Sequence, residues 1–185
     1  MYDKQISNTD FSEAPLPDSE FENCTFTACN FSGVDLSGLV FEECTFEDCN
    51  LSNALLNQTA LKSVKFRSCK MLGLDFSLCK TFLLEFDFEH CQMSMCAFPQ
   101  MKIPRTRFSH CQLQDVDFAE ANLSEAVFDH CDLAGAIFEY TNLQGADLRT
   151  ASNFYIDPET NPMKKARFSQ TGLIGLLRKY DLRVE

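Results

Sequence analysis

Histidine and cysteine stand side by side three times in this sequence, and both side chains are common ligands of Zn²⁺. The pairs lie in the stretches FEHCQM (88–93), FSHCQL (108–113) and FDHCDL (128–133), which contain every histidine of the chain: His90, His110 and His130. Cys91, Cys111 and Cys131 follow them directly. A pair binds one ion only if both side chains point toward the same place. Whether these pairs form a metal site therefore depends on the secondary structure that carries them.

Large apolar residues recur every five positions in two long series. The first series runs from Phe11 to Phe76 and the second from Phe88 to Leu148, and the residue two places before each member is uncharged and mostly small. All ten cysteines hold this smaller position. A period of five fits neither a helix nor a plain strand. It requires a chain that turns a corner every five residues and sends one large and one small side chain inward from each side.

A second period of twenty residues groups these sides into coils. The stretch FENCTFTACNFS (21–32) matches FEECTFEDCNLS (41–52), and the three histidines are also twenty residues apart. Four sides of five residues make one coil, so the sequence predicts an all-β solenoid of about seven stacked coils. The cysteines then face inward and the histidines lie at outward corners. We therefore expect no metal site, but a surface column of imidazoles about 4.8 Å apart, with adventitious Zn²⁺ or Ni²⁺ binding by two of them as the alternative.

The motifs VDLSG (34–38), ANLSE (121–125), TNLQG (141–145) and ADLRT (146–150) resemble the A(D/N)LXX consensus of the pentapeptide-repeat family. The resemblance covers about residues 9–150. It implies a right-handed quadrilateral β-helix whose central Leu or Phe fills the interior. On this basis residues 1–10 form an N-terminal cap, residues 11–150 the repeat domain, and residues 151–185 a C-terminal turn and helix. The register shifts by two residues within 77–87, which predicts a bulge or a small corner loop there.

The C-terminal segment changes character after Thr150. The stretch IDPETNP is typical of a turn, and Ser169 or Thr171 can cap a short helix beyond it. A solenoid needs its last coil covered. In the quinolone-resistance members of the family a C-terminal helix also joins two subunits, so the resemblance implies a homodimer, and a segment that only caps the last coil is the alternative. The candidate cap and dimerisation residues are Leu173, Ile174, Leu176 and Leu177.

Charge is distributed in bands along the chain, which has a net charge of −11. Residues 5–60 and 109–148 hold ten and eight acids without a single Lys or Arg, and a basic belt from Lys62 to Arg107 separates them. The twenty-residue spacing predicts ion pairs between coils, such as Glu42 with Lys62, Glu47 with Arg67 and Asp129 with Arg149. Eight acids of the two acidic bands are candidate partner-binding residues: Glu42, Glu43, Glu47, Asp48, Asp115, Asp117, Glu120 and Glu125.

The sequence predicts a protein-binding module and no enzyme, because it contains no phosphate-binding loop, no nucleophile elbow and no zinc-ligand motif. Its acidity argues against direct nucleic-acid binding, and nothing in it predicts a membrane span, a cofactor or a signal peptide. We expect a cytoplasmic protein with reduced thiols. The resemblance implies a DNA mimic that binds DNA gyrase or topoisomerase IV and protects it from quinolones or toxins. The long Qnr-type loops are absent, however, and an interaction scaffold with a different protein partner remains the alternative.

Overall fold

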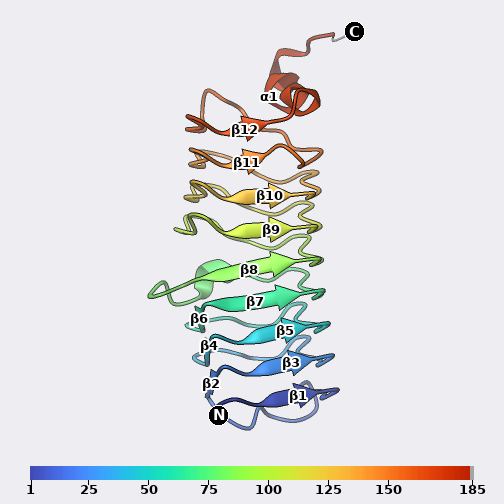
Figure 1. Ribbon diagram of the computed structural model, residues 1–185, viewed down its shortest axis with the longest axis vertical. Helices are drawn as coiled ribbons and strands as arrows, with labels where there is room; N and C mark the ends of the chain where they lie inside the picture. Colours follow the sequence, from blue (N-terminus) through green and yellow to red (C-terminus); the bar gives the residue numbers. More distant parts are fainter. Residues whose placement is uncertain (184–185) are drawn as a thin grey trace.

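The chain folds into a rod of stacked coils in the computed structural model, which describes residues 1–183 (Figure 1). Parallel strands from successive coils form a nine-stranded sheet along one wall and a three-stranded sheet along a second wall. The first sheet contains β1 (Gln5–Ser7), β3 (Thr25–Thr27), β5 (Thr45–Glu47), β7 (Val64–Arg67), β8 (Phe86–Glu89), β9 (Arg107–Ser109), β10 (Val127–Asp129), β11 (Asp147–Leu148) and β12 (Arg167–Phe168). The second contains β2 (Glu20–Glu22), β4 (Val40–Glu42) and β6 (Ala60–Lys62). The predicted β-solenoid is confirmed, but it has about eight turns where about seven were expected.

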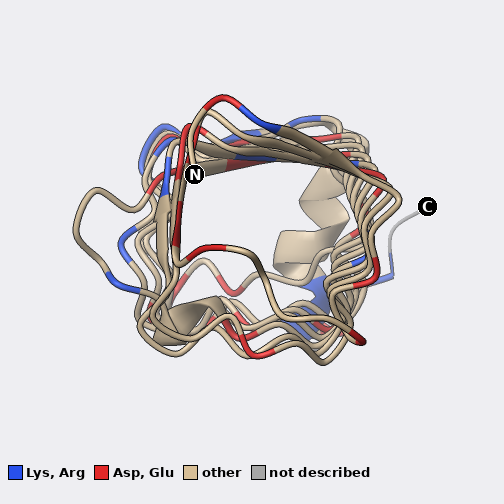
Figure 2. Ribbon diagram, turned by 90° about the horizontal axis from the view of Figure 1, so that it is seen from below, with Lys and Arg blue, Asp and Glu red and all other residues tan. Residues whose placement is uncertain are grey.

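Viewed along its axis, the rod has a four-sided outline with the coils nearly superimposed (Figure 2). Single parallel bridges hold the remaining walls together, as between Asp117 and its neighbours Ala97 and Ile137. The ladder also extends beyond residues 11–150, because β1 pairs with β3 at one end and β12 pairs with β11 at the other. Within residues 1–183, no helix combines the length and apolar character that crossing a bilayer requires.

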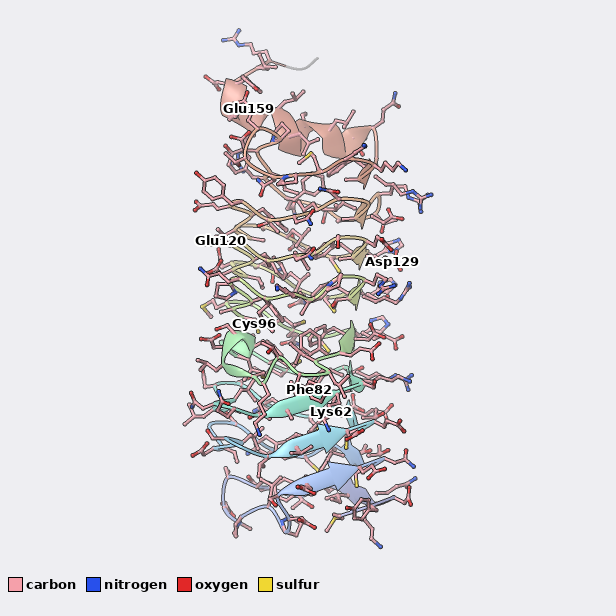
Figure 3. All side chains as sticks on the ribbon, turned by 90° about the vertical axis from the view of Figure 1, so that its left-hand side faces the viewer. Lys62, Phe82, Cys96, Glu120, Asp129 and Glu159 are labelled. Atoms are coloured by element: carbon pink, nitrogen blue, oxygen red, sulfur yellow. The ribbon has the colours of Figure 1, made fainter. Side chains whose placement is uncertain are left out.

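The break in the repeat is an outward loop that leaves the ladder intact. Phe46 pairs with Phe66 at a spacing of twenty, Phe66 with Phe88 at twenty-two, and Phe88 with Phe108 at twenty again. The two extra residues are absorbed between η1 (Phe76–Leu78) and β8, in a turn at Phe82 and Leu83. These two side chains are 75% and 62% exposed, and their loop projects from the wall (Figures 1 and 3). The sheet therefore continues in register on both sides of the break.

Columns of phenylalanine rings fill the interior. On the wall of the nine-stranded sheet, rings stack from one coil to the next with centroids 4.9 Å apart for Phe26 and Phe46, and 5.1 Å apart for Phe108 and Phe128. This distance follows the spacing of stacked strands, so the same residue type fits in every coil. The largest fully buried side chains are Phe21, Phe26, Phe31, Phe41, Phe46, Phe66, Phe76, Phe88, Phe98, Phe108, Phe118 and Phe128.

The smaller inward residues serve a second purpose, because many can donate a hydrogen bond to the coil before them. The thiols of Cys44 and Cys131 each lie 3.4 Å from a carbonyl oxygen, that of Phe21 and that of Phe108, and Thr141 Oγ1 donates to Phe118 O at 2.8 Å. All ten cysteines are buried and free. Burial raises the thiol pKa of Cys44 to about 11 and that of Cys96 to about 12, which keeps these thiols protonated.

The corners of the coils are built by residues in the left-handed backbone region. The three histidines adopt φ values of 54°, 52° and 51°, and acids such as Glu43 and Asp48 adopt 52° and 53°. This conformation is uncommon for residues other than glycine, and here the regular hydrogen bonds between coils hold it in place. Its consequence is that the corner side chains point outward, away from the core.

The C-terminal segment closes the last coil with three short helical turns, η2 (Thr171–Leu173), α1 (Ile174–Leu177) and η3 (Arg178–Tyr180). Ser169 Oγ accepts the Gly172 N–H at 3.0 Å, in keeping with the predicted cap. Lys179 Nζ binds Asp157 at 2.7 Å and Glu159 at 2.8 Å, and hydrogen bonding to these two carboxylates raises the pKa of Lys179. These two ion pairs connect the IDPETNP turn to the helical segment that covers the core.

Candidate functional site

The interior of the rod offers no room for a ligand in the described part of the chain. A void beside Phe41, Phe46 and Phe66 has a volume of about 10 Å³, at most what a single water molecule needs. The larger hollows are open and lie on the outer surface, for instance one of about 640 Å³ between the Leu83 loop, Lys62 and Arg105. Binding must therefore involve the outer walls and corners.

The first group of predicted acids lies on the two sheet walls and the corners that end them. Glu42 ends β4 and forms an ion pair with Lys62 at 2.8 Å. Glu47 ends β5, while Glu43 and Asp48 occupy corners. Within residues 1–183, no side-chain hydrogen bond or ion pair involves Glu43, Glu47 or Asp48, so three of these four charges face solvent without a protein partner.

The second group lies mainly on other walls. Asp117 belongs to the bridge line with Ala97 and Ile137 and accepts the Ala119 N–H at 2.8 Å, which is a local structural role. Asp115, Glu120 and Glu125 occupy corners, and Gln100 donates to Glu120 at 3.2 Å (Figure 3). The predicted acids are not gathered on a single face: acidic positions occur around the whole outline of the rod (Figure 2).

The predicted ion pairs between coils form in part. Glu42 binds Lys62 as expected, but Arg67 Nε lies 3.4 Å from Glu89 and Arg149 binds Asp147 at 2.7 Å. No ion pair in residues 1–183 joins Glu47 to Arg67 or Asp129 to Arg149, so these two predictions were wrong. Hydrogen bonding from Arg149 lowers the pKa of Asp147 to about 2. An exposed arginine can reach several acids, and ion pairs with these alternative partners have nearly equal free energies, so the sequence spacing does not decide which pair forms.

The histidine column has the predicted geometry. Its ring centroids are 4.8 Å apart from His90 to His110 and from His110 to His130, with the rings within 13° and 7° of parallel. The rings are exposed, whereas the neighbouring cysteines are buried. The prediction that each histidine and its cysteine do not converge on one ion is therefore confirmed.

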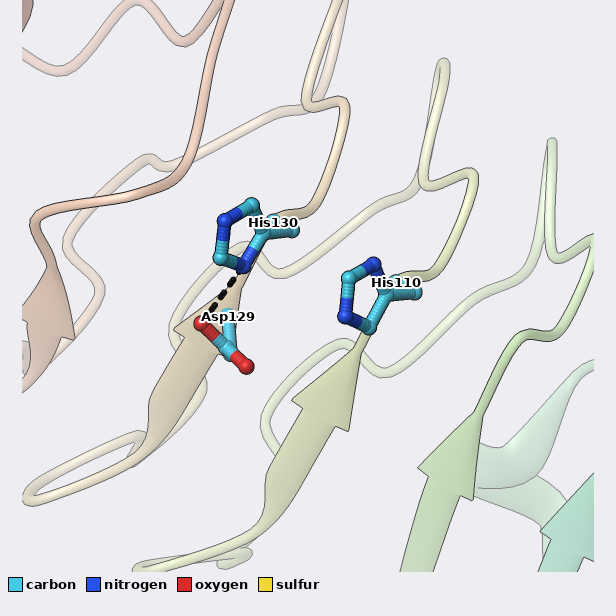
Figure 4. Close-up of side chains that lie close together, drawn as sticks. All are labelled: His110, Asp129 and His130. Atoms are coloured by element: carbon cyan, nitrogen blue, oxygen red, sulfur yellow. Dashed lines mark hydrogen bonds and ion pairs between the residues drawn. The ribbon is translucent and has the colours of Figure 1, made fainter.

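Sequence reasoning missed one member of this surface, the carboxylate of Asp129. Asp129 Oδ1 lies 2.9 Å from His130 Nδ1 and accepts a hydrogen bond from Thr150 Oγ1 at 3.0 Å (Figure 4). The hydrogen bond from Thr150, followed by that from His130, lowers the pKa of Asp129, so the carboxylate is ionised at neutral pH. The available signal was the stretch FDHC itself, in which an acid precedes the histidine that stacks on His110.

The candidate dimerisation residues separate into two kinds. Leu173, Ile174 and Leu177 are 44%, 58% and 38% exposed, whereas Leu176 is half-buried and packs against the core. Two further exposed apolar side chains, Tyr180 and Leu182, extend this end of the rod. The exposed set, Leu173, Ile174, Leu177, Tyr180 and Leu182, is called the terminal apolar patch below.

Comparison with known protein families gives two matches, both to pentapeptide repeats. The model described as a pentapeptide repeat region matches residues 19–86, and the model of eight pentapeptide repeats matches residues 111–149. Together they span more than half of the chain. No curated protein sequence gives a match.

Solved structures with the same repeat are also similar. A trypsin-treated form of QnrB1, a plasmid-mediated fluoroquinolone resistance protein, is 19% identical with a TM-score of 0.53, over 100% of this chain and 99% of that one. A second trypsin-treated QnrB1 is 21% identical with a TM-score of 0.48 over the same shares. Rfr23 from the cyanobacterium Cyanothece 51142 is 17% identical with a TM-score of 0.36, over 79% and 88%. The first of these likenesses shows a shared fold.

The five-residue period, the stacked phenylalanine core and the two family matches agree with one another. The chain belongs to the pentapeptide-repeat family.

Proposed function

We propose that this protein is a non-catalytic binding module that docks on the DNA-binding surface of DNA gyrase or topoisomerase IV and protects the enzyme from quinolones or toxins. The observation that carries the proposal is a rod with a net charge of −11 whose acidic residues are spread around its circumference (Figure 2). QnrB1, which has the same fold, is a fluoroquinolone resistance protein. A cytoplasmic location, where thiols stay reduced, belongs to the same proposal.

The dimensions of the rod support a comparison with DNA. The nine strands of the main sheet are separated by eight intervals, and at about 4.8 Å each the ladder is roughly 38 Å long. B-DNA of that length has about 11 base pairs and about 22 phosphate charges. The net charge of the chain is half of that. A rod with this charge is attracted to the basic DNA-binding surface of the enzyme over several ångströms. Because it has half the charge of DNA of the same length, it should compete with DNA less strongly than an equal length of duplex would.

A supercoiling assay tests this function. We expect the purified protein, at micromolar concentration, to alter gyrase supercoiling or to restore it in the presence of ciprofloxacin. A triple variant, Asp115→Lys, Glu120→Lys and Glu125→Lys, should weaken the effect about tenfold or more, because like charges facing each other across an interface cost several kcal/mol. Asp117 is left unchanged because its carboxylate holds the Ala119 N–H. Lysine fits these corners, since Arg105 and Lys165 adopt the same left-handed conformation with φ of 63°.

The matched control reverses three acids of the other group, Glu43→Lys, Glu47→Lys and Asp48→Lys, which changes the net charge by the same amount. Unequal losses between the two triple variants would identify the wall that docks. No effect of the unmodified protein over a wide titration would contradict the proposal. The Phe82–Leu83 turn presents two adjacent apolar side chains that are 75% and 62% exposed. Adjacent exposed apolar groups can mark a protein-contact surface, and this turn therefore favours the second candidate, a scaffold with a different protein partner.

We further propose that the terminal apolar patch joins two copies into a homodimer. Changing Ile174, which is 58% exposed, to glutamate should dissociate the dimer, because a buried unpaired charge at an interface costs several kcal/mol. Light scattering after gel filtration should give the mass of two chains for the unmodified protein and the mass of one chain for the variant. Leu55→Glu is the control, since Leu55 is 49% exposed on the rod wall. A monomeric unmodified protein would refute the dimer.

A further inference from the structure

We propose that His110, Asp129 and His130 form a solvent-open Zn²⁺ site on the wall of the rod. One ligand atom from each residue can be chosen so that all lie within 4.8 Å of one another. The closest pair, His130 Nδ1 and Asp129 Oδ1, is 2.9 Å apart, and both side chains point to the same side of the strands as His110 (Figure 4).

The donor set suits zinc. Imidazole nitrogen and carboxylate oxygen bind Zn²⁺ at about 2.0–2.2 Å, and a tetrahedral arrangement at that radius separates ligand atoms by roughly 3.3 Å. The 2.9 Å separation of His130 Nδ1 from Asp129 Oδ1 is close to this value. Three protein ligands leave the fourth position to water, as in zinc sites that are open to solvent.

One movement is needed to complete the site. The His110 and His130 rings lie 7° from parallel, and the lone pair of an imidazole nitrogen lies in the plane of its ring. Two stacked rings therefore cannot both direct a lone pair at one ion, and the His110 ring must turn out of the stack. The His110 ring is exposed, so it can turn into solvent, and the rotation gives up its stacking contacts with His90 and His130.

Thr150 fixes the other half of the site. Its Oγ1 donates to Asp129 Oδ1 at 3.0 Å and accepts the backbone N–H of His130 at 2.9 Å. A single hydroxyl from the following coil thus positions both the carboxylate and the corner that bears the imidazole. Groups of this kind orient metal ligands without touching the ion, so Thr150 is a positioning residue.

The same column contains its own control, because its lower end lacks a usable carboxylate. His90 stacks on His110 just as His130 does. However, the residue before His110 is Ser109, and Glu89, the residue before His90, lies 3.4 Å from the guanidinium of Arg67. The structure therefore assigns the ion to the upper pair of histidines and leaves His90 outside the site.

Calorimetric titration of the full chain with ZnCl₂ at neutral pH tests the assignment. We expect one Zn²⁺ per chain at micromolar affinity, with His110→Asn and His130→Asn each weakening binding about tenfold or more, and Asp129→Asn weakening it by a smaller but clear factor. His90→Asn should stay within about twofold of the unmodified protein. Asparagine is the replacement of choice because it tolerates the left-handed conformation that all three corners require.

Four results would overturn the site. They are the absence of saturable binding, an equal loss in the His90 variant, unchanged affinity in Asp129→Asn, and persistent binding in the double variant His110→Asn with His130→Asn. The third would mean that the carboxylate is no ligand, and the fourth that zinc binds elsewhere. Circular dichroism checks that each variant stays folded. The readout is metal binding alone, so it is independent of any effect on gyrase.

Discussion

Replacing Phe108 by alanine is expected to lower the free energy of unfolding by about 3–5 kcal/mol. The side chain is 0% exposed and its ring lies between those of Phe88 and Phe128, with centroids 5.2 Å and 5.1 Å away. The ring of Phe118 also packs against it edge-on at 5.9 Å. Alanine would leave a void across the centre of the rod, and the hydrogen bonds between coils prevent the walls from collapsing into it.

Denaturant titration of both proteins measures this loss, and Phe82→Ala is its matched control. Phe82 loses the same atoms on mutation but is 75% exposed on the corner loop, so we expect a change within about 0.5 kcal/mol. Because each coil contacts only its neighbours, we do not expect that stabilising a distant coil rescues the Phe108 variant. Equal losses for the two variants would show that the phenylalanine columns do not carry the stability of the rod.

The fold was predictable because every coil requires the same kinds of residue at the same inward positions. One large and one small residue must enter from each side, so the positions of Phe108 and Cys111 are legible from the five-residue period alone. Ring centroids about 5 Å apart also explain why phenylalanine recurs in a column. The two-residue break was legible for the same reason, since the large residues resume two places late, at Phe88.

The surface was less predictable because several arrangements differ there by less than about 1 kcal/mol. Arg149 could reach Asp129 one coil away, but binds Asp147 two residues before it at 2.7 Å. Likewise, the twenty-residue spacing predicted the histidine stack, but the approach of Asp129 to His130 depends on a Thr150 hydroxyl from the next coil. Neither the wall on which each acid lies nor these choices of partner follow from charge bands along the sequence.

The end of the ladder was missed because its residues no longer look like the repeat. Asn153 and Pro158 stand at central positions, yet the spacing of twenty persists, and Asn161 follows Thr141 by twenty residues. The large-apolar rule fails there, whereas the inward position itself remains, since Asn161 is only 2% exposed. A search by position, without regard to residue type, would have extended the solenoid to β12.

Asn161→Ala is expected to lower the free energy of unfolding by about 2–4 kcal/mol, although it removes only a small side chain. In the preceding coil the Ala121 N–H donates directly to Phe118 O at 3.1 Å. At the equivalent turn Asn161 stands between the two groups: its Oδ1 accepts the Thr141 N–H at 2.7 Å and its Nδ2 donates to Phe138 O at 2.9 Å. Alanine would leave both backbone groups without partners, at about 1–3 kcal/mol each.

Two further variants separate this hydrogen bonding from simple loss of volume. Asn161→Asp keeps the acceptor for Thr141 but turns a negative charge toward Phe138 O, so at neutral pH it should destabilise at least as much as alanine. Asn57→Ala, at an exposed asparagine whose amide donates only a 3.4 Å hydrogen bond to Ser37, should cost less than about 0.5 kcal/mol. Amide hydrogen exchange at Thr141 should accelerate most in Asn161→Ala, because Asn161→Asp keeps an oxygen that accepts this N–H. A protected Thr141 amide in Asn161→Ala would mean that the two backbone groups had paired directly, as in the coil before, and that the side chain is dispensable.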